Sequence, residues 1–263
     1  FIFQPAEEGL GGAREMVKDG LFDRFPCQRV FALHNWPDLP AHHVATRPGP
    51  IMAAADKFEI VVKGKGGHAA TPHVTPDAIL AASEMVGQLN TIIARRIPPM
   101  ATAVLSVTRI AGGHAHNVIP AAVTLGGTVR SFDPAIQDRI EASLRQVVEG
   151  VALAHGVTAE IVYDRYYPAT INDADAAAAA LAVAATVSPH AFTAPDPAFT
   201  SEDFAFMLQA TRGAYLWLGQ GADHGQSACG SPLHHPHYDF NDAIIPTGIR
   251  LHAGLVEAHL KAA

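Results

Sequence analysis

The segment from residue 57 to residue 163 constrains the fold most, because its apolar residues change their spacing in a regular order. They alternate with polar residues where a strand is expected and recur every three or four positions where a helix is expected. These patterns predict strands over 57–63, 102–110, 123–130 and 159–163, and helices over 76–94 and 134–154, with Thr75 and Pro76 as N-cap and first residue of the first helix. The order is that of a ferredoxin-like unit, an antiparallel sheet with helices on one face.

The segments on either side have the short apolar runs and helical stretches of an α/β protein. They predict a buried strand over 1–3, a helix that starts at Glu7 and Glu8 and stops at Asp19-Gly20, strands over 30–33 and 214–218, and helices over 173–187 and 246–260. We therefore predict an α/β fold in which residues 1–54 and 166–263 form one discontinuous domain. It holds an inserted ferredoxin-like domain, residues 55–165.

The composition narrows the class of protein. Of the 263 residues, 49% are hydrophobic and 16% are charged, against a charged share of about 25% in typical globular proteins. The chain can therefore bury a full core. Its formal net charge is -7 and no run of Lys or Arg forms a basic patch, which argues against nucleic acid and anionic membranes as partners.

The longest nearly apolar run, residues 176–187, is shorter than the roughly 20 residues that span a bilayer. The two cysteines, Cys27 and Cys229, are too few for a disulfide scaffold, so a plain structural role and a reducing, cytoplasmic location are expected. The chain lacks an initiator Met and opens in an apolar run. We therefore expect it to be a fragment of a longer protein.

Acidic and imidazole side chains occur where chemistry is expected. Glu7 and Glu8 are adjacent, so their side chains diverge, and one can bind a metal while the other faces a substrate. His34 follows the predicted strand 30–33, at the edge where open α/β sheets place their sites, and His234 stands in a Leu-His-His-Pro run. Such a nitrogen and oxygen set suits Zn²⁺ or Mn²⁺. The plainer alternative is that the two glutamates only stabilise a helix N-terminus.

Seven motifs in order make the chain resemble the M20 metallopeptidase family. They are FQPAEEGLGGA at 3–13, ALHNWP at 32–37, GKGGHAA at 64–70, GGHAHNVIP at 112–120, GTVRSF at 127–132, SEDF at 201–204 and LHHPHYDFND at 233–242. Within the family, they are most similar to the amidohydrolase branch, which contains hippurate hydrolases and N-acyl-amino-acid amidohydrolases. The resemblance implies a metal-dependent hydrolase that splits an N-acyl or N-aroyl amino acid, a small-molecule substrate, into acid and amino acid.

The same resemblance implies roles for particular residues. Glu7 would be the general base, and Glu8, His34 and His234 would bind the metal. A complete site in the family holds two divalent ions, for which Zn²⁺, Mn²⁺, Co²⁺ and Ni²⁺ are all candidates. His235 and His237 are weaker candidates, because the family ligand is the His directly after the Leu.

In the inserted domain, the resemblance implies that His68 reaches the substrate carbonyl across a homodimer interface formed by this lid domain. Asn117 and Arg130 would hold the substrate carboxylate or a developing oxyanion, which requires hydrogen-bond donors. The alternatives are that Gly66 and Gly67 only form a turn, that Asn117 caps a loop, and that Arg130 makes a surface ion pair.

The chain also departs from the family pattern. The Cys-Gly-His-Asp motif, whose Cys and His complete the metal site in the family, is missing from this sequence. Because metal ligands are then missing, a non-catalytic fragment or dimerisation and binding module stays open. A dipeptidase or carboxypeptidase of the same superfamily is a further alternative.

Overall fold

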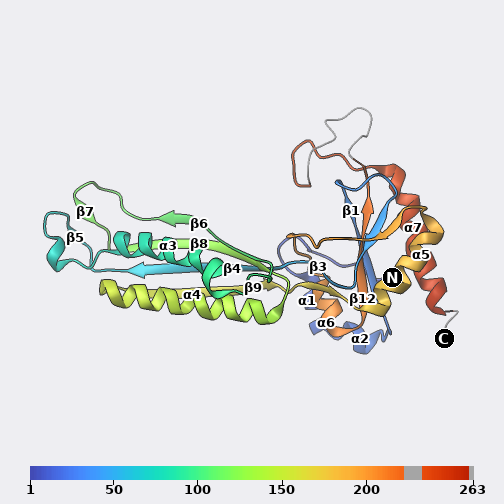
Figure 1. Ribbon diagram of the computed structural model, residues 1–263, viewed down its shortest axis with the longest axis horizontal. Helices are drawn as coiled ribbons and strands as arrows, with labels where there is room; N and C mark the ends of the chain where they lie inside the picture. The colour runs from blue at the N-terminus through green and yellow to red at the C-terminus, as the bar shows by residue number, and fades with distance from the viewer. Residues whose placement is uncertain (222–232, 261–263) are drawn as a thin grey trace. The chain divides into compact units, whose positions relative to one another are not determined.

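The computed structural model describes residues 1–221 and 233–260 and consists of two compact units (Figure 1). The first unit comprises Phe1–Met52, Thr170–Ala198 and Glu202–Ala263, and the second comprises Ala53–Ala169 with Phe199–Ser201. The first unit is therefore built from separate stretches of the chain. Each unit has its own hydrophobic core.

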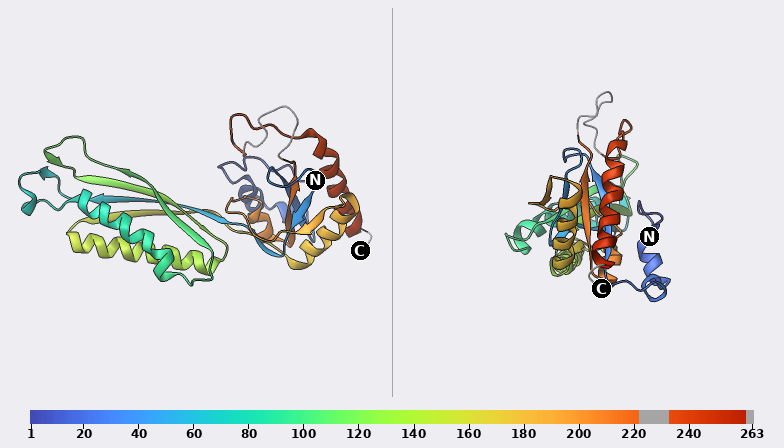
Figure 2. Two further views of the ribbon diagram at one scale, coloured as in Figure 1. Left: turned by 45° about the horizontal axis from the view of Figure 1, so that its top comes forward. Right: turned by 90° about the vertical axis from the view of Figure 1, so that its right-hand side faces the viewer.

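The second unit contains a four-stranded antiparallel sheet in the order β6-β8-β4-β9. Its elements are β4 (Ala54–Lys63), α3 (Ala78–Arg96), β6 (Ala103–Ala111), β8 (Ala122–Ser131), α4 (Pro134–His155) and β9 (Thr158–Tyr167). All six elements expected between residues 57 and 163 are present, with ends shifted by a few residues. The two helices lie side by side on one face of the sheet (Figure 2).

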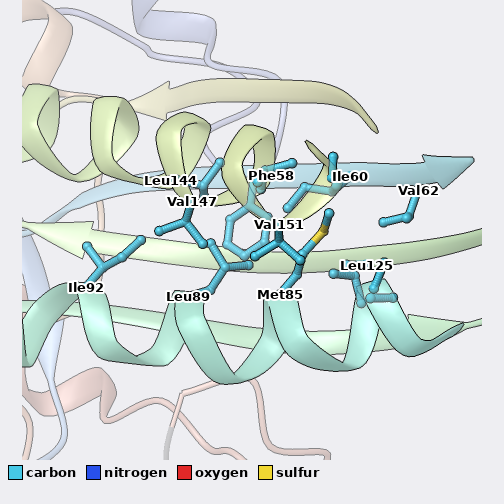
Figure 3. Packing of buried hydrophobic residues seen from close by; sticks show 14 of the residues in the cluster. Phe58, Ile60, Val62, Met85, Leu89, Ile92, Leu125, Leu144, Val147 and Val151 are labelled. Atoms are coloured by element: carbon cyan, nitrogen blue, oxygen red, sulfur yellow. The ribbon is translucent and has the colours of Figure 1, made fainter. Parts of the chain in front are cut away.

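The core of this unit lies between the helices and the sheet, as Figure 3 shows. Phe58, Ile60 and Val62 alternate along β4 and point to one face of the sheet, as the period of a strand requires. They meet the buried stripes of α3 and α4, which include Met85 and Leu144. Fully burying each such side chain stabilises the unit by about 1.5–3 kcal/mol.

The expected start of α3 at Thr75 and Pro76 is wrong. Asp77 is the N-cap, because its carboxylate accepts hydrogen bonds from the backbone N–H groups of Ile79 and Leu80, at 2.8 and 3.1 Å. The Thr75 hydroxyl instead donates to the carbonyl oxygen of Thr71 at 3.3 Å.

A small two-stranded sheet, β5 (Gly67–His68) with β7 (Val118–Ile119), also belongs to the second unit. The 3-10 helix η1 (Pro72–Val74) follows β5. Gly66, just before β5, has a φ of +71°, and a Cβ there would meet Ala121 at 3.2 Å. The left-handed backbone conformation therefore favours glycine here, and a Cβ would also crowd Ala121.

The first unit has a mixed four-stranded sheet in the order β1-β12-β2-β11. Its strands are β1 (Val30–Trp36), β2 (Val44–Thr46), β11 (Ala191–Thr193) and β12 (Gly213–Gly219), and a separate pair joins β3 (Gly49–Met52) to β10 (Thr170–Asn172). β12 runs parallel to β1 and antiparallel to β2. All seven residues of β12 are buried, so both of its faces are covered.

Helices cover the sheet of the first unit on both faces. Tyr215 and Trp217 of β12 pack in the cluster that includes α1 (Gly12–Lys18) and α6 (Ala205–Ala210). Leu216 and Leu218 face the opposite cluster, with α5 (Ala174–Val187) and α7 (Ile245–Leu260), which lie side by side (Figure 2). The short α2 (Leu21–Arg24) and the 3-10 helix η2 (Asp242–Ile244) complete the unit. The chain therefore has a mixed α/β fold.

Two expected strands of the first unit differ from the structure. Residues 1–3 form no strand, and the side chains of Phe1 and Phe3 are almost wholly exposed, because no described strand pairs with them. β1 continues to Trp36, because its parallel register with β12 runs to Gly219. His34 therefore lies inside this strand and not after its end.

None of the described helices is long and apolar enough to cross a bilayer. Cys27 is a free, exposed cysteine, and Cys229 lies outside the described residues.

Candidate metal centre

Glu7 and Glu8 lie in a tight turn before α1. The expectation that they start this helix is therefore wrong. The N–H of Gly9 donates to the carbonyl oxygen of Glu7 at 2.8 Å. Ala6, just before the two glutamates, has a φ of 53°, a left-handed conformation that costs a non-glycine residue about 1–3 kcal/mol. A Cβ at Gly12 would fall 1.8 Å from the carbonyl oxygen of Pro5. The turn is therefore packed against the start of α1.

Glu7 meets two buried carboxylates from a distant part of the chain. Carboxylate oxygens of Glu7, Glu202 and Asp203 all lie within 4.8 Å of one another. Burial raises the pKa of Glu7 to about 7, helped by repulsion from Glu202, Asp203 and Glu8 and opposed by a backbone hydrogen bond from Asp203. Concentrated negative charge of this kind favours a proton or a cation.

Asp203 fixes the turn from both of its ends. One carboxylate oxygen accepts a hydrogen bond from the N–H of Ala13 at 2.9 Å, and the other accepts from the Gln4 side-chain amide. Burial raises the pKa of Asp203 to about 6, although the bond from Ala13 works against this. Residues on both sides of the Glu7–Glu8 turn are therefore held by one carboxylate.

The Glu202 carboxylate is also fixed by two hydrogen bonds. The Tyr215 hydroxyl donates to its Oε2 at 2.6 Å, and the N–H of Phe204 donates to its Oε1 at 3.1 Å. The roles of Glu202 and Asp203 are not predicted from the sequence. The available signal was a pair of adjacent acids in an otherwise apolar stretch, inside the SEDF motif.

The structure brings Glu8 and His234 together. Nδ1 of His234 lies 3.9 Å from Oε1 of Glu8, and both side chains are largely exposed. His234 has a φ of 68°. Backbone strain of this kind concentrates at functional sites, which is consistent with the predicted role of this histidine.

His34 lies beside an open space, with its ring orientation set by its neighbour. Its Nδ1 is 2.6 Å from the carbonyl oxygen of Asn35, so this nitrogen carries the proton and Nε2 keeps a lone pair for a ligand. A cavity of about 490 Å³, lined mostly by residues of β1 and α7, opens beside it. Among residues 1–221 and 233–260, Glu7, Glu202 and Asp203 are the one group of three potential ligands at metal spacing. Joint ligation by Glu8, His34 and His234 stays a prediction.

In the second unit, His68 lies in β5 of the small sheet, and Asn117 lies in the turn just before β7. His68 pairs with Val118, and the N–H of Ala69 donates to the carbonyl oxygen of Asn117 at 3.0 Å. Nδ1 of His68 accepts a hydrogen bond from the N–H of Ala70 at 3.0 Å. The neutral ring therefore carries its proton on Nε2, which is free to act as a donor.

Arg130 lies in β8 and is half-buried. Its Nη1 is buried and has no hydrogen-bond partner among the described residues, and burial lowers the pKa of its guanidinium. The surface ion pair considered for Arg130 does not form with any residue in the described part of the chain. A buried, unsatisfied cationic donor is costly, so this atom has capacity for an anionic ligand.

Comparison with known proteins identifies the family. The model of Peptidase family M20/M25/M40 matches residues 1–258. An N-acetylcysteine deacetylase of Bacillus subtilis (strain 168) is 34% identical over 258 residues, which cover 97% of this chain and 64% of that protein. An N-acetyldiaminopimelate deacetylase of Geobacillus sp. (strain WCH70) is 35% identical over 249 residues, 95% of this chain and 64% of that protein.

A solved structure agrees with these matches. A dinuclear metal-binding peptidase of the M20 family from Bacillus subtilis superposes with a TM-score of 0.80 and 31% identity, over 100% of this chain and 65% of that protein. The chain thus spans slightly less than two thirds of the length of these relatives. With its family model matched over residues 1–258 and its fold shared, this chain belongs to the M20 peptidase family.

Proposed function

We propose that this chain contributes the general base and part of the metal site of a metal-dependent amidohydrolase that cleaves N-acyl amino acids. The observation that carries the proposal is the Glu7–Glu8 turn, in which one glutamate meets buried carboxylates while the next faces His234 at 3.9 Å. Adjacent side chains with different surroundings suit different tasks. Membership of the M20 family supports the same chemistry.

The donor set fits a divalent cation. Glu8 offers carboxylate oxygens, and His34 offers Nε2 because its Nδ1 is engaged with a backbone carbonyl, an arrangement common in metal-binding histidines. Repulsion from neighbouring carboxylates helps to raise the pKa of Glu7, and a cation held by Glu8 and His234 would offset that repulsion. When bound, the metal would supply Lewis-acid polarisation of the amide carbonyl and of the attacking water.

Glu7 would act first as the general base and then as the general acid of the reaction. Its carboxylate would accept a proton from the attacking water and return it to the leaving amide nitrogen. A general base works best with a pKa near the operating pH, and burial, the largest cause, raises the pKa of Glu7 above its usual value. The turn that Asp203 clamps would keep this carboxylate oriented.

The second unit would bind the acyl amino acid. We infer a ferredoxin-like lid domain through which two copies of the chain form a homodimer, with His68 donating from Nε2 to the developing oxyanion. Arg130, with its unpaired buried nitrogen, would attract the substrate carboxylate. Asn117, whose carbonyl oxygen accepts from the N–H of Ala69 directly after His68, would add a further donor through its side chain.

The substrate class is tested by hydrolysis assays. The printed names of the relatives point to N-acetyl amino acids, and N-benzoylglycine represents the N-aroyl alternative. Full-length protein loaded with Zn²⁺, Mn²⁺, Co²⁺ or Ni²⁺ should release amino acid from at least one of these compounds, and a chelator should abolish the release. A metal-loaded, folded protein that cleaves neither class would favour a non-catalytic binding module, and cleavage of dipeptides alone would favour a dipeptidase.

A further inference from the structure

Three uncharged side chains form a closed hydrogen-bond network beyond the residues discussed so far. The Asn35 amide donates to Oε1 of Gln220 at 2.9 Å, and the Tyr238 hydroxyl donates to the same oxygen at 2.8 Å. The Asn35 amide also donates to the Tyr238 hydroxyl. Residues from β1, from just after β12 and from the stretch after His234 thus meet at one point.

Gln220 is the centre of this network. It is only 3% exposed, and its side-chain Nε2 donates to the carbonyl oxygen of Asp239 at 3.2 Å. Its backbone also forms hydrogen bonds. The Gln220 N–H donates to the carbonyl oxygen of Trp36 at 3.1 Å, and the Gln220 carbonyl oxygen accepts from the Asn241 side-chain amide at 2.8 Å. One buried residue therefore joins β1 to the segment 238–241.

Each end of the network lies next to a predicted metal ligand. On one side, Asn35 follows His34 directly. The Asn35 carbonyl oxygen accepts a hydrogen bond from the His34 ring, and the Asn35 side-chain amide donates to Gln220. On the other side, the N–H of Tyr238 donates to the carbonyl oxygen of His235 at 2.9 Å, which closes a turn immediately after His234.

We infer that Gln220, Asn35 and Tyr238 are positioning residues that hold His34 and the His234 segment in a fixed relation, and thereby set the affinity for a divalent cation. The inference rests on the proposed function, because it takes both histidines as ligands. In the second coordination shell of metal sites, loss of such a partner typically weakens metal binding by about 10- to 100-fold. Without the network, the His234 segment would have to be ordered by the metal itself, at a cost in affinity.

The test uses Tyr238→Phe, which removes one hydroxyl and keeps the ring, with Tyr166→Phe in the second unit as the matched control. Zn²⁺ alone is titrated into metal-free, full-length protein in competition with a chromophoric chelator. Hydrogen exchange of the amides in 233–241 is measured without metal. We expect Tyr238→Phe to weaken Zn²⁺ binding by about 10- to 100-fold and to speed exchange in this segment. Tyr166→Phe should change neither.

A double-mutant cycle and a ligand variant complete the design. Gln220→Ala with Tyr238→Phe should cost less Zn²⁺ affinity than the sum of the single changes, because both remove the same bond. If His234→Ala weakens Zn²⁺ binding while Tyr238→Phe binds and exchanges like wild type, the positioning role is wrong and the proposed function stands. If His234→Ala itself binds Zn²⁺ like wild type, the ligand assignment of the proposed function is wrong.

Discussion

The carboxylate of Asp203 accepts a hydrogen bond from the backbone N–H of Ala13 at 2.9 Å, 190 positions away in sequence. Through this bond a buried acid of one segment fixes the start of α1 and the turn that carries Glu7. Asp203→Ala should therefore lower the free energy of unfolding by about 1–3 kcal/mol, the cost of leaving a buried N–H unsatisfied.

This loss should be measured by urea denaturation near pH 5. Because the pKa of Asp203 is raised to about 6, repulsion between the carboxylates is weak there and cannot hide the lost hydrogen bond. Asp196→Ala, at an exposed position of the same unit, is the control. Equal stability of the two variants would show that Asp203 does not clamp the turn.

Asp56 makes the stability of the second unit depend on pH. It is 1% exposed, accepts hydrogen bonds from Gln137 and Tyr163, both at 2.7 Å, and has its pKa raised by burial. The folded pKa lies above the unfolded value of about 3.9, so the stabilisation is complete below that value and is lost as the pH rises through the folded pKa.

Asp56→Asn cannot ionise and should escape this loss. The stability of Asp56→Asn relative to wild type should therefore increase as the pH rises from about 4. Urea denaturation followed by circular dichroism at several pH values measures the difference. Asp164→Asn, exposed on β9, should give a flat difference, and a flat difference for Asp56→Asn as well would contradict the account.

Burial on α4 should decide the cost of removing a leucine side chain. Leu144 is fully buried in the core of the second unit, whereas Leu153 on the same helix is 83% exposed. Leu144→Ala should lower the free energy of unfolding by about 2–5 kcal/mol through lost burial and a cavity. Leu153→Ala should have little effect, and similar losses in both variants would contradict the described packing.

The sequence predicted the second unit better than the first for a physical reason. Strand and helix periods in 57–163 come from one face of each element packing on a single core, so Phe58, Ile60 and Val62 reveal the strand directly. In the first unit, burial depends on neighbours that are distant in sequence. Residues 1–3 have the composition of a buried strand but no described partner, and the three-residue strands β2 and β11 are too short to show a period.

The site shows the same limit. Glu7, Glu8, His34 and His234 stood out because of their residue types and motifs. The contact of Glu7 with Glu202 and Asp203 joins segments that are distant in sequence, so the spacing of residues along the chain could not predict it. The turn around Glu7 likewise depends on Ala13 meeting Asp203.

His68 should act on the active site of the partner subunit in the proposed homodimer. Loss of its donor in His68→Ala should lower kcat by about 10²–10³-fold, as for other oxyanion donors. Mixing His68→Ala with Glu7→Gln, each inactive alone, should restore activity, because one site of a mixed dimer then has both residues intact. Mixed dimers that form by mass measurement yet stay inactive would exclude action across the interface.

In the proposed mechanism Glu7 moves protons while Glu8 binds metal. Metal content and turnover of Glu7→Gln and Glu8→Gln, measured in the full-length protein with N-acetyl amino acids as substrates, separate these two roles. Glu7→Gln should keep its bound metal and lose turnover, whereas Glu8→Gln should lose metal. A Glu7→Gln protein with near-normal kcat, or a Glu8→Gln protein with unchanged metal content, would contradict the account.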